Sequence, residues 1–376
     1  MYFVHPQIKL NKENWLKIFS CFLKKPDFKS VKEKLSSYFP QKQIIFTDMG
    51  RTAFKIIVEK LNLSDSSILV PAYICDIFYP IFKKYNISPI FLDADLKTFN
   101  IKTEEVEKKI TPKTKAILLC HTYGLKTNKI PEILSLAKKY NLKVIEDLSH
   151  SFGGIFNSQY LGNFSDASFI SLYKQFSTLR GGMLICPPHW EIKLERTSFN
   201  FRDFISFLNC FPFFAFLFKN FFSEIAPGFV RKEKKEEFSK INNVSLNLFS
   251  FFLKDFENNL KNRAKLALFF QEELKKLGFK VQEGKDNVFC YLSVLVPKNL
   301  GRNEFGKRLK EKGIFCTRIW HRPIILNPEV QKEYKINLSD YPDTIEIAKR
   351  IVNFPLQNFY FKKDIEKIIK LVACNM

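Results

Sequence analysis

Asp147 and Lys174 are the two side chains whose positions first indicate chemistry in this sequence. Residues 143–147 (KVIED) form a short apolar run that ends in a carboxylate. A carboxylate at the C-terminal end of a parallel strand faces the crevice in which open α/β sheets bind ligands. Taken alone, Asp147 could equally cap a helix or pair with a nearby base.

Lys174 follows another apolar run and precedes the pair Gly181-Gly182. Glycine pairs permit a close approach of the backbone, although most lysines of a basic chain are simply solvated. A third feature is the turn Gly50-Arg51-Thr52, which begins a predicted helix. A helix N-terminus with a glycine and a small hydroxyl can bind phosphate, and an ordinary N-cap is the alternative.

Together these three features predict one cofactor, pyridoxal 5′-phosphate (PLP). PLP needs a lysine amine for its aldehyde, an acid beside its ring nitrogen and anion donors for its phosphate. The chain supplies them in the order phosphate helix, aspartate strand and lysine strand. This order resembles that of the fold-type I PLP enzymes.

The elements that must position these groups alternate along residues 45–186. Buried strands are predicted at residues 67–71, 87–93, 115–120 and 143–147, and helices at 51–63, 73–85, 103–110 and 130–140. Near-continuous apolar strands between helices predict an α/β fold whose mostly parallel sheet is covered on both faces. Two further strands, at 167–173 and 182–186, are expected to be neighbours.

The C-terminal part predicts a smaller α+β domain. One long helix, interrupted or paired, is expected over residues 244–277, followed by strands at 279–282, 287–296 and 314–320 and helices at 303–312, 344–352 and 363–372. We therefore expect an N-terminal helical segment at 1–40, a large PLP-binding domain at 41–240 and a small C-terminal domain at 245–376.

Short motifs along most of the chain make it similar to the DegT/StrS family of PLP-dependent sugar aminotransferases. They are GRTA at 50–53, VPAY at 70–73, FLDAD at 91–95, TPKTKAI at 111–117, HTYG at 121–124, IEDLSHSFG at 145–153 and FPL at 354–356, with Asp364-Ile365. Lys174 also lies seven positions before Gly181, as in the family. The resemblance implies the fold-type I PLP-transferase fold.

The resemblance implies a role for each motif residue. Lys174 would hold the cofactor and, after an amino donor displaces it, act as the general base of transamination. Asp147 would keep the ring nitrogen protonated, and His150 would contact the phenolic oxygen of the ring. The phosphate would be held by Ser171 and by the turn formed by Gly50, Arg51 and Thr52. The family's dehydratases carry histidine in place of the lysine, so Lys174 favours transamination.

Several positions depart from the family, mostly on the substrate side. Cys75 occupies the position that often carries an aromatic residue stacked on the cofactor ring, and Tyr73 is the candidate substitute. Leu179-Arg180 replaces a Gly-Glu pair. Residues 242–245 (NNVS) are the nearest counterpart of a family stretch that crosses the dimer, and they lack its arginine.

A Phe-rich stretch at residues 204–222 lies within an insert at about 200–237. Nine of its nineteen residues are Phe, and the charged run 231–237 follows it. Three interpretations stay open. The stretch could be a buried or dimer-interface helical hairpin, a segment lying on a membrane surface, or a membrane span, which Asn209, Pro212 and Lys219 would interrupt.

Composition narrows the class of partner. The 376 residues carry a formal net charge of +22, which indicates either a lysine-rich surface or attraction to an anion such as a nucleotide sugar or a membrane. The sequence has no nucleic-acid-binding motif. Its eight cysteines form no CxxC pair and no metal-site spacing, so no metal is expected. The first residues lack the layout of a signal peptide, which predicts a cytoplasmic location, with membrane association as an open alternative.

We therefore expect a homodimeric aminotransferase that moves an amino group, from glutamate, to a keto group of a nucleotide-activated sugar for polysaccharide or glycoconjugate biosynthesis. Arg318 and His321 are candidate substrate contacts, with a purely structural role as the alternative. Two other functions stay open: a PLP enzyme acting on a non-sugar or lipid-linked ketone, and a non-enzymatic relative acting as a regulator or a membrane-associated scaffold. The presence of Lys174 and Asp147 favours an enzyme.

Overall fold

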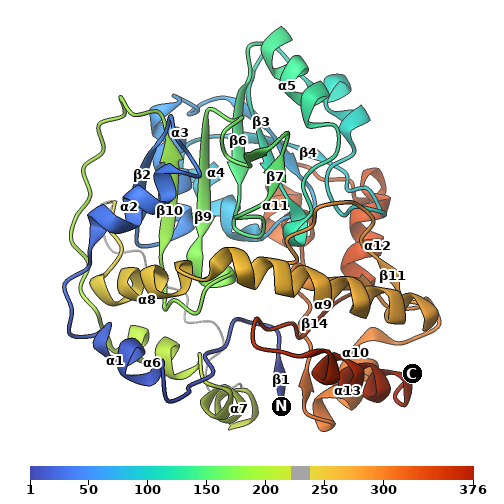
Figure 1. Ribbon diagram of the computed structural model, residues 1–376. Coiled ribbons are helices and arrows are strands. Elements are labelled where there is room, and N and C mark those ends of the chain that lie inside the picture. The colour runs from blue at the N-terminus through green and yellow to red at the C-terminus, as the bar shows by residue number, and fades with distance from the viewer. Residues whose placement is uncertain (222–237) are drawn as a thin grey trace.

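A seven-stranded sheet forms the centre of the molecule (Figure 1). This computed structural model describes residues 1–221 and 238–376. The strand order is β2-β10-β9-β6-β5-β3-β4. The strands are β2 (Gln43–Thr47), β3 (Ser67–Pro71), β4 (Ser88–Leu92), β5 (Thr114–Cys120), β6 (Lys143–Asp147), β9 (Ala167–Ser171) and β10 (Gly182–Cys186).

The sheet is mostly parallel, as the apolar strands predicted. Parallel pairs join β4, β3, β5, β6 and β9 in that order. Strand β10 runs antiparallel to both of its neighbours, β9 and β2. The predicted α/β class is thus confirmed, and so is the pairing of the strands expected at 167–173 and 182–186.

Helices cover both faces of this sheet, which explains why its strands read as continuous apolar runs. Helices α3 (Gly50–Lys60) and α4 (Tyr79–Lys84) pack on one face. Helices α2 (Phe28–Ser36), α5 (Ile130–Lys139) and α8 (Asn243–Leu253) pack on the other. The neighbours Phe169 and Ile170 on β9 belong to the two opposite cores, because successive side chains of a strand point to opposite faces.

Two predicted helices in this half are wrong in extent or type. Helix α4 begins only at Tyr79, after a 3₁₀ turn at Asp76–Phe78, because Pro80 fits the first turn of a helix but not its interior. The predicted helix at 103–110 consists of two 3₁₀ turns, Thr103–Glu105 and Glu107–Lys109. A run of eight residues is short for an isolated α-helix.

The C-terminal part adds a three-stranded antiparallel sheet, β11 (Lys280–Val281), β12 (Leu292–Leu295) and β14 (Ile351–Phe354). The expected long helix is interrupted at Lys254-Asp255, which separates α8 from α9 (Phe256–Lys276). The predicted helix at 344–352 ends early, because α12 (Pro342–Arg350) leads directly into β14. The remaining helices are α10 (Arg302–Glu311), α11 (Pro328–Glu333) and α13 (Lys362–Ala373).

The N-terminal segment is not helical throughout. It contains α1 (Trp15–Ser20) and α2, but it begins with the strand β1 (Tyr2–Phe3). Strand β1 pairs in parallel with β13 (Ile314–Phe315), which lies more than 300 residues away in the sequence. The strand predicted at 314–320 is limited to these two residues of β13. The predicted domain boundaries stay a prediction.

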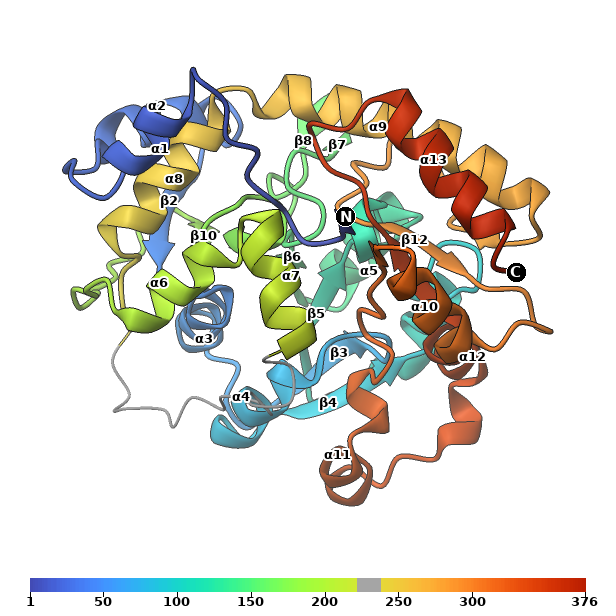
Figure 2. The same cartoon turned by 90° about the horizontal axis from the view of Figure 1, so that it is seen from below.

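The described part of the Phe-rich insert forms two helices, α6 (Phe201–Leu208) and α7 (Pro212–Phe221). Their axes differ by 110° across a short break, and among the residues that the structure describes, no single helix is long and apolar enough to cross a membrane. The bent pair is long and apolar enough for a membrane span only when its two helices are counted together. Seen from below, α6 and α7 lie in front of the sheet (Figure 2). The charged run at 231–237 lies outside the described residues.

Candidate active site

A cavity of about 250 Å³ lies where β6 and β9 end. Seven of the residues predicted from the sequence line it, and they come from four separate segments of the chain. They are Gly50, Arg51, Cys75, Asp147, His150, Ser171 and Lys174. The fold therefore brings the predicted phosphate turn, the strand-end carboxylate and the lysine to one place.

The N-terminus of α3 forms one end of this cavity. Its N-cap residue, Met49, makes no side-chain hydrogen bond to the first turn. A Cβ atom added to Gly50 would lie 2.3 Å from Ser171 Oγ and 3.1 Å from the Ile170 carbonyl oxygen, so a larger residue here would press against the end of β9. The Ser171 backbone amide donates a hydrogen bond to Ser149 Oγ at 2.9 Å. Helix amides and two hydroxyls around a cavity suit a phosphate group.

The glycine pair after Lys174 sets the distance between β10 and the phosphate turn. A Cβ atom on Gly182 would lie 2.3 Å from the backbone of Met49. Gly181 has a φ of 139°, which disfavours residues with a side chain. The pair thus has a structural role: it allows the antiparallel strand to pass directly beside the turn.

Asp147 is nearly buried at the end of β6, and its Oδ1 accepts a hydrogen bond from the Ser149 amide at 2.9 Å. Lys174 follows β9 in a 3₁₀ turn, Leu172–Lys174, and its Nζ lies 3.3 Å from His150 Nε2. Burial alone would lower the pKa of Lys174. The acidic groups of Tyr173 and Asp147 outweigh that effect, so this pKa lies above its ordinary value.

His150 is buried beside this lysine. Burial, together with the charge of Lys174, holds the pKa of His150 well below its usual range, so the ring is neutral. The backbone amide of Tyr123 donates to His150 Nδ1 at 3.3 Å. The tautomer that accepts this bond at Nδ1 has its hydrogen on Nε2, the nitrogen that faces Lys174. In this tautomer His150 can donate a hydrogen bond into the cavity.

Comparisons with known proteins agree with this geometry. Residues 20–373 match the DegT/DnrJ/EryC1/StrS aminotransferase family. The chain belongs to this family. Membership confirms the fold class, the enzyme class and the PLP cofactor that the sequence predicted.

The relatives that align with most of this aminotransferase have low sequence identity to it. It is 25% identical to dTDP-3-amino-3,6-dideoxy-alpha-D-galactopyranose transaminase of Aneurinibacillus thermoaerophilus, over 90% of this chain and 87% of the relative. It is 24% identical to dTDP-4-amino-4,6-dideoxy-D-glucose transaminase of Shigella dysenteriae, over 92% and 89%. A Helicobacter pylori aminotransferase involved in the biosynthesis of pseudoaminic acid has the same fold, with a TM-score of 0.75, 17% identity and coverage of 100% and 99%.

Four residues predicted for the site of this aminotransferase lie outside the cavity lining. Thr52 Oγ1 donates a hydrogen bond to Asp48 Oδ1 at 2.6 Å, so its hydroxyl is occupied. Tyr73 is buried, and its hydroxyl lies 2.7 Å from that of Tyr123. Two further side chains are held within the C-terminal part: Arg318 donates to the side chain of Asn303, and His321 Nδ1 lies 2.7 Å from the Arg318 carbonyl oxygen.

The sequence did not indicate several residues that line the cavity, above all Trp320. The Trp320 ring lies 4.7 Å from that of His150, and Lys174 Nζ lies 5.6 Å above it. Trp320 has a φ of 59°, in the left-handed region that bulky residues rarely adopt. Ser149, Tyr291 and His5 also line the cavity. Ser149 could have been found from its place two residues after Asp147, whereas His5 gives no local signal.

Proposed function

We propose that this enzyme transfers an amino group from glutamate to the keto group of a nucleotide-activated sugar. The observation that carries the proposal is the convergence of Lys174, Asp147 and the N-terminus of α3 on one cavity. The full-length relatives support the sugar substrate, because their names describe transaminases of dTDP-linked deoxysugars. A role in polysaccharide or glycoconjugate biosynthesis follows from that substrate class.

Each residue of the cavity would have its own role in transamination. The bound cofactor supplies an aldehyde and an electron-withdrawing ring. The Asp147 carboxylate would hold a proton on the ring nitrogen, and His150 Nε2 would donate to the phenolic oxygen. Gly50, Arg51, Ser149 and Ser171 would surround the phosphate. The Lys174 amine would be the general base that removes the proton from the amino-bearing carbon of glutamate. In the second half-reaction its ammonium form would protonate the carbon of the sugar that receives the amino group.

The surroundings of Lys174 favour this proton transfer. Trp320 and Tyr291 form aromatic walls around His150, with the Tyr291 ring 5.2 Å from the His150 ring. Such walls restrict the entry of water, which strengthens the electrostatic contacts in the cavity. Asp147 is one of the groups that raise the pKa of Lys174, and pairing of Asp147 with a protonated ring nitrogen would weaken that effect. A neutral lysine amine is the form that can accept a proton.

Two other features of the enzyme are proposals. We infer that it acts as a homodimer in the cytoplasm, as the sequence predicted. We also infer that residues 204–222 contact a membrane at its surface, which concerns a part of the molecule separate from the cavity.

The activity is tested with purified protein loaded with PLP. Glutamate alone should release one equivalent of 2-oxoglutarate, and addition of keto-sugar nucleotides should then yield an amino sugar detectable by mass spectrometry. Release of 2-oxoglutarate without any amino-sugar product, but with amination of simple ketones, would replace the sugar substrate by a non-sugar one. No keto-acid release from any amino donor would contradict the transaminase proposal itself.

A further inference from the structure

Exposed apolar side chains are concentrated in two segments of the chain that pack against each other. Among the described residues, ten of the eighteen exposed large apolar side chains come from two short segments, 10–23 and 199–214. We call these ten residues the aromatic surface: Leu10, Trp15, Leu16, Phe19, Leu23, Phe199, Phe201, Phe204, Phe213 and Phe214. Soluble proteins rarely expose large contiguous apolar patches, and such patches mark interaction sites.

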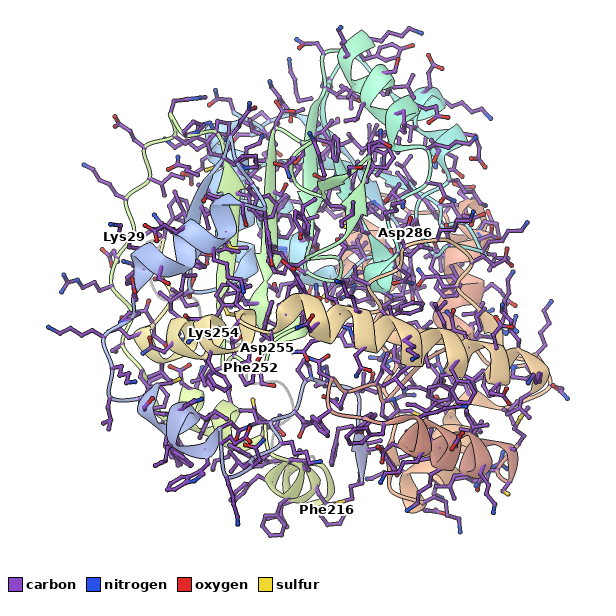
Figure 3. All side chains as sticks on the ribbon, viewed as in Figure 1. Lys29, Phe216, Phe252, Lys254, Asp255 and Asp286 are labelled. Carbon is purple, nitrogen blue, oxygen red and sulfur yellow. The ribbon has the colours of Figure 1, made fainter. Side chains whose placement is uncertain are left out.

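The exposure of this surface is large. Leu23 exposes 89% of its area, Phe201 exposes 74% and Leu16 exposes 61%. Helices α1, α6 and α7 lie at the lower end of the molecule, below α8 (Figure 1). Phe216 of α7 lies near the lower edge of the molecule (Figure 3). The surface therefore lies at one end of the protein and is accessible to a large partner.

Buried contacts hold the two segments together beneath this surface. The Phe22 ring lies 4.7 Å from the Phe207 ring of α6, and the Phe19 ring lies 6.2 Å from it. The Ile8 amide donates to the Cys210 carbonyl oxygen at 2.7 Å. Ile18, Cys21 and Phe207 share one buried apolar cluster. The exposed side chains therefore project from two segments that are packed against each other.

Basic side chains accompany the apolar ones. The segment 9–25 carries five exposed lysines and a single acidic residue, Glu13. The lysines are Lys9, Lys12, Lys17, Lys24 and Lys25. In α6, Arg202 is exposed, whereas Asp203 is buried and paired with Arg180. The face therefore combines aromatic and aliphatic groups with net positive charge.

We propose that the aromatic surface docks on a lipid bilayer that contains anionic phospholipids, so that the enzyme lies on the membrane without crossing it. Exposed Trp, Phe and Leu beside lysines are the pattern of helices that lie in a membrane interface. Helices α6 and α7 meet at 110°, and neither is long enough to span a bilayer.

Charge favours a bilayer over a second copy of the chain. A symmetric dimer through this face would bring the same exposed lysines of segment 9–25 of the two copies together. An anionic lipid surface attracts the same lysines. The proposal concerns a face separate from the cavity, so it stands or falls independently of the chemistry proposed above.

Vesicle flotation tests the docking with the full chain. The protein should float with vesicles of phosphatidylcholine and phosphatidylserine, bind pure phosphatidylcholine at least about fivefold less, and be released in part by high salt. The variant Leu16→Ser/Leu23→Ser/Phe201→Ser should lower the bound fraction about tenfold, because it removes three of the most exposed apolar groups.

A matched variant controls for the loss of apolar surface as such. Leu268 and Phe361 expose 54% and 62% of their area, but they lie on or beside α9 and α13, outside the aromatic surface. Leu268→Ser/Phe361→Ser should bind vesicles like the unaltered protein. All proteins should show the same far-ultraviolet circular dichroism, which excludes misfolding as the cause of a difference.

Trp15 gives a second measurement that does not depend on the multiple variant. Its emission should shift to shorter wavelength when anionic vesicles are added, and Trp15→Phe should remove the shift. The proposal is overturned if the protein fails to float with anionic vesicles, or if the control variant loses binding equally. It is also overturned if the serine variant instead converts a dimer into a monomer in sedimentation, since the face would then be a self-interface.

Discussion

The cavity and the aromatic surface are built in opposite ways. The cavity is enclosed by strand ends and a helix N-terminus, where a single added Cβ on Gly50 or Gly182 would collide with its neighbours. The aromatic surface consists of side chains that project from short helices and that touch little beyond their own base. Residues of the first kind are constrained by the fold around them, whereas residues of the second kind are constrained only by a partner outside the chain.

One ion pair connects these two regions. In the sequence, Arg180 lies between Lys174 and β10. Its Nη2 atom donates to Asp203 Oδ2 of α6 at 2.8 Å, and both side chains are buried. Asn242 Nδ2 donates to the same oxygen at 3.2 Å. Leu179-Arg180 was a departure from the family pattern in the sequence. The structure gives it a reason, because Arg180 fixes the insert to the segment that carries Lys174.

The largest effect on activity is expected from removal of the Lys174 amine. Lys174→Ala should lower the rate of 2-oxoglutarate release from glutamate about a thousandfold or more, because the amine that moves the proton is removed. Lys143→Ala, at an exposed position at the start of β6, should retain the full rate. Stopped-flow measurement of both variants decides, and a Lys174→Ala rate within tenfold of the original would show that another group is the base.

The next effect concerns the link between the two regions. Asp203→Ala should lower the free energy of unfolding by about 3–5 kcal/mol, because it leaves the Arg180 guanidinium buried without its partner. The exposed pair Lys362–Glu366, with N and O atoms 3.7 Å apart, is the control, and Glu366→Gln should change that free energy by less than about 1 kcal/mol. Denaturant titration measures both, and equal changes would mean that the buried pair does not hold the insert.

The pH dependence of cofactor loading tests the charge of Lys174 before the cofactor binds. Only the neutral amine of Lys174 can attack the PLP aldehyde, and its pKa is raised above the ordinary value. The neutral fraction therefore increases with pH, by about tenfold per unit below the pKa. The second-order rate of PLP loading should rise up to about a hundredfold from pH 7 to pH 9. A rate that levels off near pH 7 would place this pKa well below its ordinary value.

The smallest effect tests the close packing of the cavity wall. Gly182→Ala should lower the free energy of unfolding by about 1–3 kcal/mol, because its Cβ would collide with the Met49 backbone. Gly306 is the control, since it lies inside α10 with nothing within 4 Å of an added Cβ. Gly306→Ala should raise that free energy by about 0.5–1 kcal/mol. Denaturant midpoints with the same sign for both variants would contradict the packing argument.

The sequence predicted the cavity well because its parts are local. A strand end at Asp147, a helix start at Gly50 and a lysine before a glycine pair can each be recognised within a few residues. In a parallel sheet, strand ends meet at one edge, so local signals suffice to bring these groups together. Thr52 and Tyr73 were assigned to the same site, but hydrogen bonds to Asp48 and Tyr123 hold their hydroxyls elsewhere. Such competing bonds cannot be read from a motif.

Contacts between residues that are far apart in the chain could not be predicted from the sequence. Trp320 reaches the cavity only because the C-terminal part folds back over β6 and β9, and the strand β1 pairs with β13 from the other end of the chain. The aromatic surface could not be predicted for the same reason. The Phe-rich stretch was evident, but nothing in the sequence joined it to residues 10–23, which supply half of the aromatic surface.

Identification of the lysine that holds the cofactor tests the central claim most directly. The PLP-loaded enzyme is reduced with borohydride, digested, and its peptides are sequenced by mass spectrometry. The account predicts a single pyridoxyl modification, on Lys174, with none on the other lysines of this basic chain. Modification of a different lysine, or no stoichiometric modification in protein that binds PLP, would contradict it.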